Sequence, residues 1–251
     1  MARRPSSMDL SSWTIFSLLD KEFSAQIRLA CVFGNLGNEA LVVTRDDEVF
    51  ALGSNGAGCL GLGDMHSTLA PKQVEPLCSR RVVGFAYGSG PHVLAFTEAG
   101  ELYSWGHNGY CQLGNGSTNQ GLTPAVIQNS LLGRKVVEVA CGSHHSLCLT
   151  ADGDIFSWGQ NNCGQIGSGT TTNQSTPRKV SASFGGRKVP APLLPTPLHT
   201  LPPHAPPHLP PPPPPPPPHH PPGGGHHLWA DQLHGCPRER GGEGGGGELT
   251  P

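Results

Sequence analysis

The chain repeats itself with a constant step of 53 residues, and this repeat limits the possible folds more than any single motif does. Gly53, Gly106 and Gly159 are related by that step. The same step relates four further sets of positions: Asn55, Asn108 and Asn161; Gly61, Gly114 and Gly167; Gly63, Gly116 and Gly169; and Pro71, Pro124 and Pro177. Because five classes of position keep one register, we expect a series of similar structural units.

Each repeat contains two predicted strands joined by a tight turn. In the second strand of each pair an aromatic residue and a small residue alternate, which is typical of a half-buried strand. The turns are short and contain Asp, Gly or both, residues that suit tight hairpins. The predicted pairs are 40–44 with 48–55, 92–97 with 101–108, and 145–150 with 154–161.

Two more short strands are expected in each repeat. One lies at 72–74 and its equivalents, and the other at 82–87 and 136–141. Four short strands in about 50 residues, with glycine-rich turns, are typical of a β-propeller blade and not of a helical repeat. Kelch blades have a similar length, but the Gly-Gly doublet expected within such a blade is missing from the repeats at 32–180.

Two segments carry a more specific pattern. The stretches 105–114 and 158–167 read Trp-Gly-His-Asn-Gly-Tyr-Cys-Gln-Leu-Gly and Trp-Gly-Gln-Asn-Asn-Cys-Gly-Gln-Ile-Gly. They resemble the signature of chromosome-condensation-regulator repeats, as does Ala-Cys-Gly-Ser-His-His at 140–145. The sequence departs from the signature at Leu52, which replaces the tryptophan, and at Cys111, which replaces a glycine.

Within that family, the stretch from Trp13 to Val180 resembles the vertebrate subfamily that joins such a propeller to BTB domains. The matching segments are 15–18, 28–34, 87–92, 105–110 and 142–145. The resemblance implies an all-β fold, with about three of the family's seven four-stranded blades present. It also implies that the BTB domains of those relatives are absent here, so that the chain is expected to be a truncated form.

Composition divides the chain into three parts. Leu19, Phe23, Ile27 and Ala30 recur at helical spacing and predict a short amphipathic helix packed on the first blade. Residues 181–251 hold 21 of the 27 prolines, including the run Pro210 to Pro218. A segment of this kind is expected to be disordered. The predicted layout is an N-terminal segment at 1–31, blades at 32–180, and a Pro/Gly/His-rich tail at 181–251.

Several functions are not expected from this sequence. The net charge is −2 and no block of Lys or Arg is present, so direct nucleic-acid binding is not predicted. No apolar run approaches the roughly 20 residues of a membrane helix. Motifs for a hydrolase elbow, a zinc protease or a phosphate loop are missing, so no enzyme, cofactor or catalytic residue is predicted.

His144 and His145 are a candidate pair of metal ligands. Adjacent residues in a strand point to opposite faces, so the pair is expected to be structural and no metal residue is predicted. Trp105 and Trp158 alternate with aromatic neighbours and are expected to pack between blades. Because about three blades leave two faces of the propeller open, the strand segments 93–96 and 147–149 are expected to be exposed.

The expected function is that of a protein interaction scaffold with partners bound by the propeller loops. The alternative is a guanine-nucleotide exchange factor for a Ran-type GTPase, the activity of the founding member of the family. The run Pro210 to Pro218 is a possible ligand for SH3, WW or profilin-type domains, because polyproline II is already extended. A cytoplasmic or nuclear location, or both, is expected from the missing secretion signal.

Overall fold

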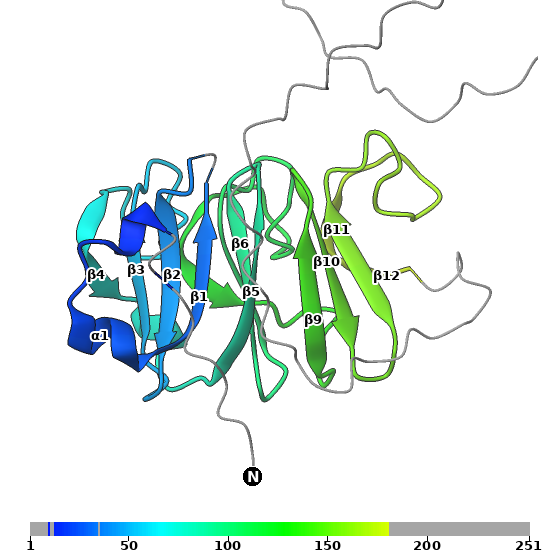
Figure 1. The fold of residues 1–251 in the computed structure, drawn as a ribbon. Coiled ribbons are helices and arrows are strands. Elements are labelled where there is room, and N and C mark those ends of the chain that lie inside the picture. Colours follow the sequence, from blue (N-terminus) through cyan, green and yellow to red (C-terminus); the bar gives the residue numbers. More distant parts are fainter. Residues whose placement is uncertain (1–9, 11–12, 35, 181–251) are drawn as a thin grey trace, which may run out of the picture. The chain divides into compact units, whose positions relative to one another are not determined.

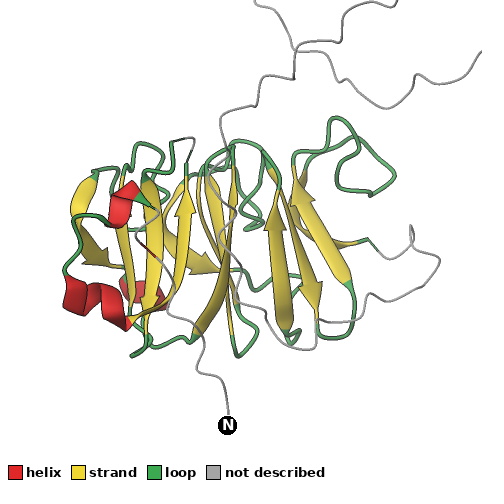
Figure 2. Ribbon diagram, viewed as in Figure 1, coloured by secondary structure: helices red, strands yellow, loops and turns green. Residues whose placement is uncertain are grey.

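The computed structural model describes residue 10, residues 13–34 and residues 36–180, and within them twelve strands form three antiparallel sheets (Figures 1 and 2). The strands of the first sheet are β1 (Ile27–Phe33), β2 (Glu39–Thr44), β3 (Val49–Gly53) and β4 (Thr68–Gln73). The second sheet has β5 (Val82–Gly88), β6 (His92–Thr97), β7 (Leu102–Gly106) and β8 (Gly121–Val126). The third has β9 (Val136–Cys141), β10 (His145–Thr150), β11 (Ile155–Gly159) and β12 (Gln174–Lys179).

Each sheet keeps its strands in chain order, so that it is a meander in which every strand pairs with the next one. Neighbouring sheets contact each other through β6 and β9, β5 and β9, and β1 and β5. This arrangement confirms the expected partial β-propeller, with one blade per repeat. The fourth strand of the first blade was predicted at 72–74, but it runs over Thr68–Gln73 and ends before Val74, which is buried.

Packing between blades buries β6 and β7, the two central strands of the second sheet, on both faces. All six residues of β6 are buried, because the second sheet lies between the other two. The expectation of an exposed row at Val93 to Phe96 is therefore wrong. In the third blade, Leu149 is also buried and Leu147 is half-buried.

Trp105 and Trp158 occupy the interfaces between blades, as predicted, and both are fully buried. The indole N–H of Trp105 donates to the carbonyl of Cys59 in the first blade at 2.7 Å. Trp158 makes the equivalent bond to Gln112 in the second blade at 2.8 Å. Both contacts combine burial of a large ring with a satisfied donor, which is the arrangement a buried indole requires.

The N-terminal helix is shorter than its periodicity indicates. α1 spans Lys21–Gln26 and is capped by Asp20, whose carboxylate accepts the amide N–H of Glu22. Ile27 and Ala30, expected on the helix, lie in β1 instead, where they pair with Thr44 and Val42. Pairing with β2 gives this segment hydrogen bonds that a lone helix end lacks. The predicted boundary between 31 and 32 consequently falls inside a strand.

The N-terminal segment covers the outer face of the first blade. Trp13 and Phe16, the latter in the 3-10 helix η2 (Thr14–Phe16), are buried in one cluster with Leu52. Leu52 occupies the position that Trp105 and Trp158 hold in the other blades. Phe23 of α1 adds an edge-on contact to Phe50, with ring centroids 5.1 Å apart. The helix thus packs on the first blade, as expected.

Cys111 adopts a backbone conformation that favours glycine. Its φ is +64°, and the equivalent residues Gly58 and Gly164 have φ values of +72° and +74°. A side chain in this region costs about 1–2 kcal/mol relative to glycine. The cysteine that departs from the repeat signature therefore keeps the glycine conformation under strain.

Candidate interaction surface

Rigid loops connect the third and fourth strands of each blade, and a buried asparagine organises every one of them. In the second blade the side-chain amide of Asn108 donates to the carbonyls of Ser117 and Asn119, both at 2.9 Å. Its carbonyl oxygen accepts the amide N–H of Leu113 at 3.0 Å. Because each polar atom of this fully buried side chain is bonded, the loop holds one shape.

The same bonds recur in the other two blades. Asn161 donates to the carbonyl of Thr170 at 2.7 Å and accepts from Ile166 at 3.0 Å. Asn55 donates to the carbonyl of Asp64 at 2.9 Å and accepts from Leu60 at 3.0 Å. These bonds explain why the asparagine recurs in every repeat. They also hold the loop backbone, from which the exposed loop side chains project, in one conformation.

Gln112 orients two aromatic residues of the second loop, the half-buried His107 and the exposed Tyr110. Its side-chain carbonyl accepts the amide N–H of Tyr110 at 2.9 Å, which fixes the orientation of the amide group. Its NH₂ group then donates to Nδ1 of His107 at 2.8 Å. His107 is therefore held with its other ring nitrogen, Nε2, directed away from Gln112.

His107, Tyr110 and His144 form an aromatic cluster at the surface, which we call the loop cluster; Tyr110 is exposed and the two histidines are half-buried. The ring centroids of Tyr110 and His144 are 4.6 Å apart, and those of His107 and His144 are 6.1 Å apart. His107 and Tyr110 belong to the β7–β8 connection, whereas His144 belongs to the β9–β10 turn. The cluster therefore bridges the second and third blades, and Tyr110 is 39% exposed.

Charge on the loop cluster depends on pH. Partial burial lowers the pKa of His144, and the neighbouring rings of His107 and His145 lower it further. Burial also lowers the pKa of His145. Both rings are therefore uncharged at neutral pH and gain charge only on acidification. At neutral pH the cluster offers aromatic surface with hydrogen-bonding groups at its edges, a chemistry common at protein interfaces.

A buried network lies beneath the loop cluster and ties the two blades together. The hydroxyl of Ser146 donates to the carbonyl of Gln112 at 2.8 Å. Nε2 of His92 lies 2.9 Å from the same hydroxyl, and Nδ1 of this ring lies 3.1 Å from the carbonyl oxygen of Gly90. Burial lowers the pKa of His92 to about 4, so this ring is neutral at physiological pH.

The adjacent residues His144 and His145 point to different surroundings. His144 packs on Tyr110, whereas His145 lies beneath Gly142, so the two rings occupy different environments. Within the described residues, no three His, Cys, Asp or Glu side chains converge as they would around a metal ion. Nor does this part of the chain contain a helix long and apolar enough to cross a membrane.

The loop cluster was missed from sequence, although a signal was present. The position of Tyr110 is held by Ala57 in the first repeat and by Cys163 in the third. A large aromatic residue that appears in one repeat only, within an otherwise regular loop, indicates a function beyond the fold. The contact with His144 links two repeats, and no spacing within one repeat predicts it.

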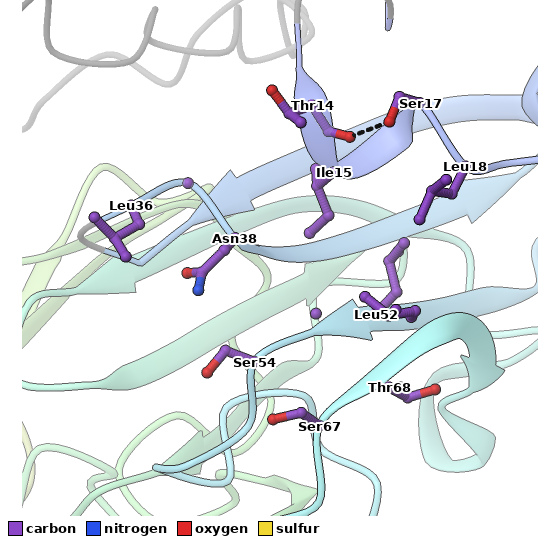
Figure 3. Close-up of a pocket in the computed structure, with 13 residues that line it drawn as sticks. Thr14, Ile15, Ser17, Leu18, Leu36, Asn38, Leu52, Ser54, Ser67 and Thr68 are labelled. Atoms are coloured by element: carbon purple, nitrogen blue, oxygen red, sulfur yellow. Dashed lines mark hydrogen bonds between the residues drawn. The ribbon is translucent and has the colours of Figure 1, made fainter.

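A second surface feature lies on the outer face of the first blade (Figure 3). It is a pocket of about 640 Å³, which we call the first-blade pocket. Ile15 and Leu18 of the N-terminal segment line it together with Leu52 of β3, and hydroxyl groups of Ser67 and Thr68 lie at its edge. The pocket is mainly apolar and carries no charged side chain among its lining residues.

Comparison with known families shows where the repeats lie. The model of the regulator of chromosome condensation (RCC1) repeat matches residues 46–95, 99–149 and 152–190, which together exceed half of the chain. A second model of the same repeat matches residues 136–165. The third match extends ten residues beyond Val180, where the resemblance was expected to end.

Curated relatives share these repeats. The mouse E3 ubiquitin-protein ligase HERC2 is 38% identical over 163 residues, which are 65% of this chain and 3% of the relative. The Arabidopsis thaliana ultraviolet-B receptor UVR8 is 32% identical over 167 residues, 66% of this chain and 38% of the relative. The human probable E3 ubiquitin-protein ligase HERC4 is 31% identical over 163 residues, 15% of its length. The chain thus spans well under half the length of each of them.

Solved structures confirm the fold. Prp20p from Saccharomyces cerevisiae, described with its binding to Gsp1p and histones, matches with a TM-score of 0.50 and 23% identity over 57% of this chain and 36% of that one. Yeast RCC1 (Prp20) bound to Kap60 matches with a TM-score of 0.53 and 19% identity, over 64% of this chain and 41% of the yeast chain. Together with the three matched repeats, these similarities show that the chain belongs to the RCC1 repeat family.

Proposed function

We propose that this protein is a non-enzymatic interaction scaffold and that the loop cluster of His107, Tyr110 and His144 binds a protein partner. The observation that carries the proposal is the position of the cluster, which lies across two blades on loops fixed by buried hydrogen bonds. Rings that are already ordered lose little conformational freedom when a partner binds.

The chemistry of the cluster indicates what kind of partner fits. Tyr110 offers an exposed ring and a hydroxyl, and aromatic residues of this kind supply much of the binding energy at protein interfaces. Burial lowers the pKa of His144, so this ring is neutral at pH 7. The ring of His107 is oriented by its hydrogen bond with Gln112. A partner surface with apolar or arginine side chains fits this site better than a phosphate-rich one.

The wider assignment of the chain follows the resemblance in its sequence. We place the blades in the subfamily that joins an RCC1-type propeller to BTB domains, on the strength of the segments 87–92 and 142–145. The proposed layout is an interaction module that begins with β1 at Ile27 and ends at Val180, preceded by the N-terminal segment and followed by the tail at 181–251. The tail and its run Pro210 to Pro218 lie outside the described residues, and its binding to SH3, WW or profilin-type domains stays a prediction.

Affinity capture tests the scaffold role, and the distribution of the tagged chain in the same cells tests its location. The full chain and a Tyr110→Ser variant are expressed with a small tag in cultured cells, and the retained proteins are identified. We expect proteins that the wild-type chain retains and the variant loses, and we expect tagged protein in the cytoplasm, the nucleus or both. Identical sets of retained proteins would contradict a role for Tyr110.

A second candidate is nucleotide exchange on a Ran-type GTPase. It is favoured by the similarity in fold to Prp20p, for which binding to Gsp1p is described. The test is release of labelled GDP from purified Ran at catalytic concentrations of the chain. Release above the spontaneous rate would favour exchange activity over a pure scaffold, and an unchanged rate would exclude it for this GTPase.

A further inference from the structure

Four histidine rings lie close together at the boundary between the second and third sheets. His92 and His107 come from the second blade, and His144 and His145 come from the third. The ring centroids of His107 and His144 are 6.1 Å apart. A Cβ atom on Gly90 would lie 2.4 Å from Cδ2 of His144, so only glycine leaves room for this ring. The backbone of one blade is therefore shaped to receive a histidine of the next.

No carboxylate balances these rings. In the part of the chain that the structure describes, none of the ion pairs includes any of the four histidines. The titratable side chains that act on the rings are the other histidines, with Tyr110 in contact at the surface. Cys141, which shares Ser146 with His92, is uncharged because burial raises its pKa. Positive charge on one ring therefore opposes charge on the others.

His107 is linked to the backbone of Tyr110 through the side chain of Gln112. Oε1 of Gln112 accepts the amide N–H of Tyr110 at 2.9 Å. The NH₂ group of the same side chain lies 2.8 Å from Nδ1 of His107 and 3.4 Å from the carbonyl oxygen of Gly90. Because this NH₂ group is a donor, Nδ1 of His107 holds a lone pair, and the single ring proton of the neutral form lies on Nε2.

Uptake of a proton by His107 reverses this bond. The second ring proton goes to Nδ1, which becomes a donor and faces the NH₂ donor of Gln112. If the amide group of Gln112 turns over, Nδ1–H gains an acceptor, but the NH₂ group then faces the amide N–H of Tyr110. Either orientation sets two donors against each other. The protonated state therefore keeps one of the two bonds at most.

The third repeat contains the same loop bond without the histidine. Oε1 of Gln165 accepts the amide N–H of Cys163 at 2.9 Å, as in the second loop. The repeat equivalent of His107 is Gln160, whose side chain does not change its charge with pH. The third loop is therefore an internal reference that keeps its bond at every pH at which the protein is folded.

We propose that the bond between Gln112 and His107 is a pH-sensitive switch, which fixes the backbone at Tyr110 at neutral pH and releases it when the loop cluster takes up protons. Histidine suits this role because its charge ordinarily changes between about pH 5 and pH 8. The switch goes beyond the proposed function and does not depend on it, because the bonds change whether or not a partner is present. For a bound partner, acidification would remove the ordered rings and add positive charge beside any arginine of that partner.

Nuclear magnetic resonance of the full chain labelled with nitrogen-15 tests the switch without a partner. The imidazole nitrogen shifts distinguish a bare ring nitrogen from a protonated one, and at about pH 7.5 we expect Nδ1 of His107 to be bare. On acidification to about pH 5.5, hydrogen-exchange protection of the Tyr110 amide should fall at least about tenfold, together with protonation of His107. The Cys163 amide should keep its protection. A protonated Nδ1 at about pH 7.5, or constant protection of Tyr110, would overturn the proposal.

His107→Asn tests whether this ring is responsible. The asparagine carbonyl oxygen lies near the position of Nδ1, so it keeps an acceptor for Gln112 but takes up no proton. Protection of the Tyr110 amide should therefore become independent of pH. The matched control is His66→Asn, at an exposed histidine on the β3–β4 connection, which should behave as the wild type does. Equal pH dependence in the two variants would contradict the assignment to His107.

Gln112→Glu tests the relay from its other side. A carboxylate offers acceptors both to the amide N–H of Tyr110 and to a protonated Nδ1 of His107. The donors then no longer oppose each other, so the Tyr110 amide should stay protected at about pH 5.5. Circular dichroism establishes that each variant is folded. A fall in protection as large as that of the wild type would overturn the proposal, and this result does not depend on His107→Asn.

Discussion

The indole N–H of Trp158 donates to the backbone carbonyl of Gln112 at 2.8 Å and joins the third blade to the second. The same carbonyl accepts the hydroxyl of Ser146 at 2.8 Å. Gln112 also orients the loop cluster through its side chain. One residue thus connects the packing between blades to the surface proposed to bind partners.

Replacing Trp158 by Phe tests the hydrogen bond to Gln112. The ring remains buried but the N–H donor is lost, so we expect the free energy of unfolding to fall by about 1–2 kcal/mol. Trp158→Leu, which copies the residue found at Leu52, removes ring volume as well and is expected to cost about 3 kcal/mol or more. Urea denaturation measures both. Wild-type stability of Trp158→Phe would show that the bond contributes nothing.

Cys111→Gly is expected to stabilise the protein. The residue has φ +64°, and glycine relieves strain of about 1 kcal/mol in this region. The matched control is Gly164→Cys, at the equivalent position with φ +74° and open space around the added Cβ. This control is expected to lose a similar amount. Shifts of the melting temperature in opposite directions for the two variants would support strain at Cys111. A lower melting temperature of Cys111→Gly would contradict it.

Trp13→Ala tests the covering of the first blade. Trp13 is 9% exposed and packs in one cluster with Phe16 and Leu52. Loss of the ring is expected to cost about 3 kcal/mol and to expose apolar surface that binds a hydrophobic dye. Leu18→Ala, at a residue that is 73% exposed, is the control and should change neither quantity appreciably. Unchanged dye binding by Trp13→Ala would show that the segment does not protect this face.

The pH dependence of stability is expected to centre on Glu39. Burial raises the pKa of its carboxyl group to about 7, and its Oε2 atom is buried without a hydrogen-bond partner among the described residues. In the unfolded chain the group ionises near pH 4.5, so ionisation favours unfolding as the pH rises from about 4.5 to about 7. Glu39→Gln removes this effect.

Between pH 4.5 and pH 7 the free energy of unfolding of Glu39→Gln should rise by about 1–2 kcal/mol relative to that of the wild type. This value allows for solvent screening of the exposed part of the side chain. His92 acts in the opposite direction, since its pKa is lowered to about 4 and its protonation favours unfolding as the pH falls below about 6.5. The difference between variant and wild type cancels the His92 contribution. If the difference in unfolding free energy between Glu39→Gln and wild type stays constant from pH 4.5 to pH 7, Glu39 is not the source of the pH dependence.

Most of the fold could be predicted from the sequence because the repeat supplies the same information three times. Period-two alternation around Trp105 and Trp158 located the central strands, and the turn residues bounded them. The prediction failed in the N-terminal segment, which has no counterpart in the other repeats. Ile27 and Ala30 lie on a helical period by coincidence, and their strand is fixed by pairing with β2, which local spacing does not encode.

The candidate site could be predicted only in part. His144 was noticed, but its contact with Tyr110 joins residues of different repeats and depends on how two blades stack. The strain at Cys111 followed from a departure already visible in the repeat. The first-blade pocket depends on Trp13 and Phe16 folding back over Leu52, a tertiary contact outside the periodic region.

The central claim is that the loop cluster binds a protein partner, and its most direct test is binding of a purified captured partner measured by calorimetry. The full chain is compared with the double variant Tyr110→Ser and His144→Ser and with Leu132→Ser, an exposed control on the β8–β9 connection. We predict that Kd rises at least about tenfold for the double variant and stays unchanged for the control. Equal Kd values for all three proteins would contradict the claim.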